Sequence, residues 1–124
     1  MVTRTVALTE LPIRGSSTNE DADNVTAISV VASDSGLLFI NKETSGTVTY
    51  TLPTLALAAG KWFWFMNAQT SFALAITGGT ASKIVYSNST TASTVTCATQ
   101  AGECGMIYCD GVNYYFFEIY GSWS

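Results

Sequence analysis

Apolar and polar side chains alternate strictly through residues 46–52, which read Gly-Thr-Val-Thr-Tyr-Thr-Leu. Val48, Tyr50 and Leu52 fall on one side of an extended chain and the threonines fall on the other, because successive side chains of a strand point to opposite faces. The pattern therefore predicts a β-strand with one buried face. Pro53 follows directly and ends the strand, since proline has no N–H to donate to a sheet.

The same succession of turn residues and short β-prone runs continues along most of the chain. Residues 33–36 and 110–113 are rich in Gly, Asp, Asn and Ser, which is typical of tight turns. Residues 61–67 are apolar on both faces, which predicts a strand that is covered on both sides. Further strands are expected at residues 25–32, 37–41, 72–77, 83–86, 91–98, 105–109 and 114–120.

About nine to ten short strands with almost no helix predict an all-β fold. The expected packing for residues 25–124 is a two-sheet β-sandwich or a jelly-roll-like barrel. Residues 9–24 are polar and rich in turn formers, and residues 1–8 have the β-prone composition of a first strand or an extended segment. We therefore expect residues 1–24 to form an extended N-terminal arm that becomes ordered on a partner.

Charged residues are scarce for a chain of this size. They make up 11% of the 124 residues, against roughly 25% in an average soluble domain. Strand edges in monomeric β-proteins are usually protected by Lys, Glu or Pro, and few such residues are present here. We infer that other subunits cover much of the surface. The net charge of −4 and five scattered basic residues argue against a nucleic-acid partner.

No membrane or secretion segment is evident. The first residues lack the apolar core of a signal peptide. The longest apolar run, residues 55–66, is too short to span a bilayer and contains Gly60 and Lys61. We therefore expect no membrane partner.

The sequence offers little material for catalysis. It contains no histidine, so a serine or cysteine nucleophile would have no imidazole base. Cys97, Cys104 and Cys109 lack a fourth soft ligand and the spacing of a zinc site. Cys97 and Cys109 lie on neighbouring predicted strands, so a disulfide bridge or two buried free thiols would fit. Free thiols are favoured because no secretion signal is visible.

Acidic residues also give no clear site. Glu20, Asp21 and Asp23 are close together and could offer oxygen ligands to calcium, but the glycine of an EF-hand loop is missing. A solvated acidic loop is the favoured interpretation. The acids of the body are few, and no pair of them is recognisable as the two carboxylates of a glycoside hydrolase. We expect no enzyme activity, no metal and no cofactor.

Aromatic side chains are the most distinctive candidates for binding. Rings on a β-strand can stack on sugars, or they can fill a core or a subunit interface. The residues that could stack on a sugar are Trp62, Trp64, Tyr108, Tyr114, Tyr115 and Trp123. We favour packing, and the candidates for an oligomer interface are Trp62, Trp64, Tyr115, Phe117 and Trp123.

A series of short motifs runs from residue 33 to residue 123. They are Asp34-Ser35-Gly36, Thr51-Leu52-Pro53, Ala58-Ala59-Gly60 before an aromatic strand, Cys109-Asp110-Gly111 before a second one, and Gly121-Ser122-Trp123. Their order resembles a β-module of tailed-phage virion proteins, found in small head-decoration (cement) proteins and in portions of tail fibres. The resemblance covers about three quarters of the chain and rests mostly on turn glycines. This chain has four aromatics at residues 114–117 where that module commonly has one, and the cysteines are not part of the pattern.

The resemblance implies a structural role without catalysis, as a homotrimer in a virion. Because the chain is short, we favour a capsid decoration protein on the outer surface of the head, which binds the major capsid protein and stabilises the assembled shell. The arm residues expected to contact the capsid are Thr3, Arg4, Thr5, Leu11, Ile13 and Arg14. The alternative is a receptor- or glycan-binding β-domain of a tail fibre or head fibre.

Overall fold

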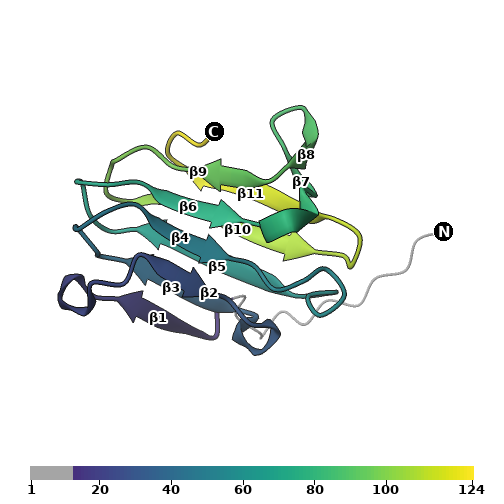
Figure 1. Cartoon of the computed structure of the whole chain (residues 1–124), viewed down its shortest axis with the longest axis horizontal. Helices are drawn as coiled ribbons and strands as arrows, with labels where there is room; N and C mark the ends of the chain where they lie inside the picture. Colours follow the sequence, from purple (N-terminus) through teal and green to yellow (C-terminus); the bar gives the residue numbers. More distant parts are fainter. Residues whose placement is uncertain (1–12) are drawn as a thin grey trace.

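The computed structural model describes residues 13–124 and confirms the prediction of an all-β protein. Within these residues, eleven strands form two sheets that face each other, and no α-helix is present (Figure 1). The large sheet contains, in spatial order, β1 (Gly15–Asn19), β3 (Leu37–Asn41), β5 (Trp62–Asn67), β10 (Glu103–Cys109), β11 (Tyr114–Tyr120), β7 (Ile84–Tyr86) and β8 (Ser89–Ala92). The small sheet contains β2 (Ala27–Ser29), β4 (Val48–Thr51), β6 (Leu74–Thr77) and β9 (Thr94–Thr96). Short 3-10 helices lie at η1 (Asp21–Asp23), η2 (Ala32–Asp34) and η3 (Gly79–Ala81).

The first six strands wind alternately between the two sheets, as in a β-solenoid. β1, β3 and β5 are parallel neighbours in the large sheet, and β2, β4 and β6 are parallel neighbours in the small sheet. Each strand therefore pairs with its equivalent one coil later. Ser16 pairs with Leu38, and Leu38 pairs in turn with Trp64.

This winding corrects the expected sandwich or jelly roll, whose neighbouring strands are mostly antiparallel. The alternation of apolar and polar side chains is the same in both architectures, because each strand has one face against the core. A solenoid differs from these folds in that its sequence repeats from one coil to the next. This repeat has a period of more than twenty residues, so it is not visible within a single strand. The strand-by-strand pattern therefore predicts the class and misses the winding.

The C-terminal part completes the large sheet with antiparallel strands. β10 pairs with β5 on one side and with β11 on the other, and β7 and β8 continue the sheet beyond β11. β9 joins β6 in the small sheet. Residues 91–98, predicted as one strand, are divided by a bend at Ser93 between β8 in one sheet and β9 in the other.

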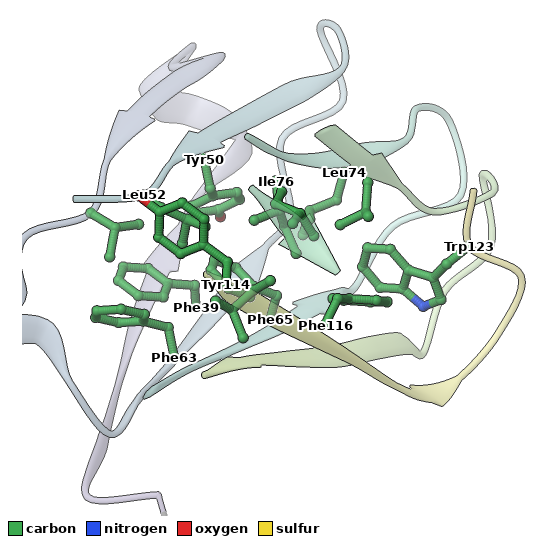
Figure 2. Packing of buried hydrophobic residues seen from close by; sticks show 14 of the residues in the cluster. Phe39, Tyr50, Leu52, Phe63, Phe65, Leu74, Ile76, Tyr114, Phe116 and Trp123 are labelled. Atoms are coloured by element: carbon green, nitrogen blue, oxygen red, sulfur yellow. The ribbon is translucent and has the colours of Figure 1, made fainter. Parts of the chain in front are cut away.

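Aromatic rings fill the space between the sheets (Figure 2). Phe39 of β3 and Phe65 of β5 stack with ring centroids 5.5 Å apart, and Tyr50 of β4 meets Phe65 at 5.4 Å. Val48, Tyr50 and Leu52, which the sequence pattern places on one face, are all buried. The predicted orientation of this strand is therefore confirmed.

The boundary of the predicted arm needs correction. Residues 15–19 form β1 and pair along their whole length with β3, and η1 follows within the first coil. The polar sequence of β1 fits an edge strand with one solvent face, because backbone hydrogen bonds to β3 hold it in place. Residues 13–24 thus belong to the body. Residues 1–12 lie outside the described residues.

Candidate functional site

The outer side of the large sheet, which points away from the small sheet, carries a continuous set of uncharged side chains. Strand register arranges them in three rows. The rows are Trp62, Tyr108 and Tyr115; Leu38, Trp64, Met106 and Phe117; and Ile40, Met66, Cys104 and Tyr120. These side chains are named the aromatic face. It arises because β5, β10 and β11 are apolar on both sides, so that one set fills the core and the other remains outside.

Several side chains of the aromatic face are strongly exposed in the single chain. The exposed fraction is 64% for Tyr120, 50% for Phe117 and 37% for Tyr108. Ile119, at the irregularity in the β10–β11 pairing, adds a further side chain that is 52% exposed. Soluble monomers rarely present large contiguous apolar patches, and such patches commonly mark interaction surfaces. The aromatic face is therefore the candidate functional site.

One end of the aromatic face has a fixed polar group beside paired rings. The rings of Tyr108 and Tyr115 are stacked with centroids 6.4 Å apart, and the Tyr115 hydroxyl donates to Asp110 Oδ2 at 2.7 Å. Asp110 Oδ1 accepts from the N–H groups of Val112 and Asn113, each at 2.8 Å. These bonds, the one from the Asn113 backbone first, lower the pKa of Asp110. The hydrogen bond to Asp110 is the main cause that raises the pKa of Tyr115.

The structure brings together four of the five predicted interface residues. Trp62, Trp64, Tyr115 and Phe117 share the aromatic face. Trp123 does not, because its side chain is buried in the core.

Trp123 is held inside by several contacts. Its ring lies 4.8 Å from that of Phe116, and its Nε1 donates to the Tyr120 carbonyl at 3.1 Å (Figure 2). An antiparallel backbone β-bridge between Trp123 and Cys97 folds the end of the described chain back onto the small sheet. The aromatic content of the C-terminal residues did not reveal this reversal.

A second tyrosine contact lies close to Trp123. The Tyr86 hydroxyl is 2.6 Å from Glu118 Oε2 and 3.0 Å from the Trp123 carbonyl oxygen. Burial, together with the hydrogen bond and charge of Glu118, raises the pKa of Tyr86 to about 12. This group joins β7 to β11 and to the C-terminal residues.

Other predicted binding residues have structural partners. Tyr114 is buried, and its hydroxyl donates to the Pro53 carbonyl at 2.5 Å, so it cannot stack on a sugar. Arg14 donates from its guanidinium to the carbonyls of Ser33 and Ser35, which ties the start of β1 to the next coil. Ile13 is 38% exposed. The remaining arm candidates, Thr3, Arg4, Thr5 and Leu11, lie outside the described residues.

A buried row of polar side chains crosses the inner face of the large sheet, and sequence reasoning missed it. Asn19 Nδ2 donates to Asn41 Oδ1 at 3.3 Å, and Asn41 Nδ2 donates to Asn67 Oδ1 at 3.1 Å. Glu103, fully buried on β10, pairs with Asn67 in the next position of the row. These residues, named the asparagine ladder, connect the three coils at one end of the strands. The signal that could have found it is an Asn as the last residue of each of the segments that form β1, β3 and β5.

The acidic residues of the first coil serve the backbone. Asp23 Oδ2 accepts from the Glu20 N–H at 3.1 Å, and Asp21 Oδ1 accepts from the Thr44 N–H at 2.8 Å. Hydrogen bonds from Thr44 lower the pKa of Asp21. Glu20 also lies 3.5 Å from the amino group of Lys42. Residues 13–124 contain no group of three or more side chains arranged to hold a metal ion.

All three cysteines are free thiols. Cys97 and Cys109 are buried, whereas Cys104 is half-buried in the aromatic face. Burial raises the pKa of Cys97 to about 11 and also raises the pKa of Cys104 and of Cys109. The thiolate is the reactive form, so these groups are weak nucleophiles at neutral pH.

Comparisons with known proteins give no assignment. No protein family model matches the sequence, and no curated protein matches it. In the part of the chain from residue 13 onward, none of the helices has the length and apolar character required to cross a membrane.

Proposed function

We propose that this protein is a structural assembly protein that uses the aromatic face to pack against other subunits, and that it serves as a capsid decoration (cement) protein of a tailed-phage head. The observation that supports assembly is the uncharged aromatic face on the outer side of a rigid sheet. The proposed place in a virion rests in addition on the sequence resemblance to the phage β-module. In this proposal the protein acts by binding and not by chemistry.

The energetics of burial favour a self-associating surface. Covering one large apolar side chain is worth about 1.5–3 kcal/mol. Phe117, Tyr120 and Ile119 are each at least half exposed in the single chain. Contact with a neighbouring copy would remove these side chains from water without a need to pair or desolvate charges. A homotrimer is the expected assembly, as the resemblance implies.

A protein of this kind stabilises a shell by mass action. It binds the assembled capsid and not the separated subunits, so each bound copy shifts the equilibrium towards the intact shell. A trimer presents three equivalent contact surfaces, and weak individual contacts then combine through effective concentration. The major capsid protein is the proposed partner.

The oligomeric state tests the proposal directly. Light scattering after size exclusion should report a trimer for the wild-type chain and a monomer for Phe117→Asp, because a buried carboxylate in an apolar interface is strongly disfavoured. Leu57→Asp is the matched control, since Leu57 is 66% exposed in the loop before β5 and is not one of the side chains of the aromatic face. A monodisperse wild-type monomer at micromolar concentration would remove the basis for assembly.

Capsid binding tests the second part of the proposal. Purified heads that lack decoration should be saturated by the wild-type trimer and should then resist heat or chelation better than undecorated heads. A trimer that forms normally and leaves every such head unbound would contradict the decoration role while it leaves self-assembly intact.

A specific geometric observation keeps glycan binding as a second candidate. The stacked rings of Tyr108 and Tyr115 lie beside the Asp110 carboxylate, an arrangement that could support a sugar ring and accept its hydroxyl hydrogens. Binding of the isolated protein to a glycan array, lost in Tyr108→Ala and kept in Leu57→Asp, would favour this function over capsid decoration.

A further inference from the structure

Two carboxyl groups meet where the first coil packs against the second. Asp21 Oδ1 accepts from the Thr44 N–H at 2.8 Å and from the Thr44 hydroxyl, which holds this side chain of the first coil against the backbone that follows Glu43. Hydrogen bonds from Thr44, and to a smaller extent one with the Glu43 side chain, lower the pKa of Asp21. The Asp21 and Glu43 carboxyl groups are therefore neighbours, and Asp21 is held in its charged form.

Glu43 is fully buried, and one of its two oxygens has no partner among the described residues. Its Oε1 atom accepts from the Ser45 N–H at 2.9 Å. No donor within residues 13–124 reaches its Oε2 atom. The ion pair found in this part of the chain joins Lys42 to Glu20 near the surface, so it does not neutralise Glu43. A buried carboxylate oxygen that lacks both a donor and a counter-charge is strongly disfavoured.

The third coil has a glutamine at the position of Glu43. Asn41 and Asn67 are register partners, so Glu43 and Gln69, each two residues further on, are equivalent. Gln69 Oε1 accepts from the Ser71 N–H at 2.6 Å, which matches the bond that Glu43 Oε1 accepts from the N–H two residues later. The two side chains therefore have the same orientation, and Glu43 Oε2 corresponds to Gln69 Nε2.

The nitrogen of Gln69 is a donor to oxygen atoms around it. It donates to Asn67 Oδ1 at 3.1 Å and to the Phe72 carbonyl oxygen. In the second coil, Asn41 Oδ1 lies at the place of Asn67 Oδ1 and accepts from the Glu43 N–H at 3.2 Å. A carboxylate oxygen has no hydrogen to donate to such neighbours. The second coil therefore needs a positive charge where the third coil has an NH₂ group.

The other acids of the first coil are engaged elsewhere. Glu20 lies 3.5 Å from the amino group of Lys42, and Asp23 Oδ2 accepts from the Glu20 N–H at 3.1 Å. Both bonds of Thr44 to Asp21 use Oδ1, so Asp21 Oδ2 remains available to a ligand. The oxygen pair that the fold brings together thus comes from two coils and not from the acidic run in the sequence.

We propose that Asp21 and Glu43 bind a calcium ion between the first and second coils, with Asp21 Oδ2 and Glu43 Oε2 as its carboxylate ligands. Calcium takes oxygen ligands and tolerates irregular geometry, whereas magnesium requires a nearly ideal octahedron. Asp21 is exposed, which gives the ion a path from solvent and leaves room for water ligands. The ion would join the two coils whether or not the protein assembles through the aromatic face.

The number of carboxylates limits the affinity of this site. Residues 13–124 have no group of three or more acidic, histidine or cysteine side chains placed to hold a metal. With two carboxylates, water would supply most of the remaining ligands. We therefore expect a dissociation constant of about 0.1–1 mM, the range of weak calcium-binding modules.

Calcium titration of the metal-free full-length protein, followed by amide NMR, tests the proposal. The amide signals of Thr44 and Ser45 should shift and saturate, because their N–H groups donate to the two ligand carboxylates. Glu43→Gln should raise the dissociation constant roughly tenfold or more, since it removes one of two charged ligands. This variant should fold, because it places in the second coil the residue that the third coil has at Gln69.

Glu118→Gln is the matched control. It removes the same charge from β11, which β5 and β10 separate from β1 and β3. Calcium should raise the melting temperature of the wild-type protein and of Glu118→Gln by mass action, and it should leave that of Glu43→Gln nearly unchanged.

Two results would overturn the proposal. One is the absence of shifts at Thr44 and Ser45 in the wild-type protein at about 10 mM calcium; a Glu43→Gln protein more stable than the wild type would then show that Glu43 carries a proton. The other is an equal calcium response of the wild type and Glu43→Gln, which would show that the ion binds to other surface carboxylates.

Discussion

Asn41 donates from Nδ2 to Asn67 Oδ1 at 3.1 Å, across the boundary between the second and third coils and at a depth that water does not reach. The Asn41 Oδ1 atom accepts at the same time from Asn19 Nδ2 and from the Glu43 N–H, at 3.3 and 3.2 Å. A single amide thus satisfies three polar groups in three segments of the chain. Breaking the asparagine ladder at Asn41 should therefore lower the free energy of unfolding by more than the loss of one hydrogen bond would.

Replacement of Asn41 by alanine should destabilise the protein by about 3 kcal/mol, because it removes three buried hydrogen bonds worth about 1 kcal/mol each. Chemical denaturation monitored by tryptophan fluorescence measures the change. Gln100→Ala, at an exposed loop position, should alter the free energy of unfolding by no more than about 0.5 kcal/mol. Equal effects of the two substitutions would contradict a structural role for the ladder.

Gly105 lies against the ring of Phe116. A Cβ atom at position 105 would come within 2.5 Å of the Phe116 Cε1 and Cζ atoms and 3.1 Å from the Phe117 carbonyl oxygen. Gly105→Ala should therefore cost about 1–3 kcal/mol of stability through overpacking. In Gly46→Ala the new methyl group would meet Thr26 at an ordinary 3.6 Å, so this variant should be close to neutral. Calorimetry on both proteins measures the difference, and a neutral Gly105→Ala would show that the β10–β11 packing is looser than described.

Trp123 and Phe117 should give opposite results in two assays. Trp123→Ala removes a buried ring and should reduce the free energy of unfolding by about 3–5 kcal/mol. Phe117→Ala removes an exposed ring and should weaken self-association with little effect on the stability of the monomer. Denaturation of dilute protein and light scattering at higher concentration separate the two effects. A large loss of monomer stability in Phe117→Ala would place that ring in the core.

The raised pKa of Tyr86 predicts a loss of stability at alkaline pH. The folded-state pKa of about 12 lies above the ordinary value of 10.0, so the protonated hydroxyl is favoured by folding. This contribution is complete below pH 10 and is lost as the pH rises through about 12. In Tyr86→Phe the free energy of unfolding should therefore decrease less over this pH range than in the wild-type protein. Urea denaturation at several pH values measures this. Parallel curves for the two proteins would contradict the assignment.

The free thiols predict a simple order of reactivity. Cys104 is half-buried in the aromatic face, whereas Cys97 and Cys109 are buried. A thiol reagent should modify Cys104 first in the native protein and all three cysteines in denaturant without a reductant. A protein that shows only one reactive thiol after denaturation would instead contain a Cys97–Cys109 disulfide.

The all-β class could be predicted because it depends on local patterns. The alternation around Tyr50 and the proline that follows the strand are visible in a few consecutive residues, and both predictions agree with the structure. The aromatic face was partly predictable for the same reason, since a strand such as residues 62–67 that is apolar on both sides must have a second covered or coverable face.

The winding and the position of Trp123 depend on information that no short window contains. β1 has a polar sequence and is part of the body because backbone bonds to β3, together with the side chains of Arg14 and Asn19, hold it there. Trp123 is adjacent in sequence to the exposed end of β11, and the return of the chain across Cys97 buries it. The recurrence of Asn19, Asn41 and Asn67 was the available clue to the coils. A comparison of the chain with itself would have revealed it.

The order of strands in the large sheet has a consequence for biosynthesis. β10 and β11 follow the other described strands in the sequence, yet they occupy the middle of that sheet, between β5 and β7. On the ribosome, the three coils can form as they emerge, but the β7–β8 hairpin has no further partner in the large sheet until residues 103–120 are inserted between it and β5. Chains that terminate before residue 103 should therefore leave the β7–β8 hairpin detached from the rest of the large sheet.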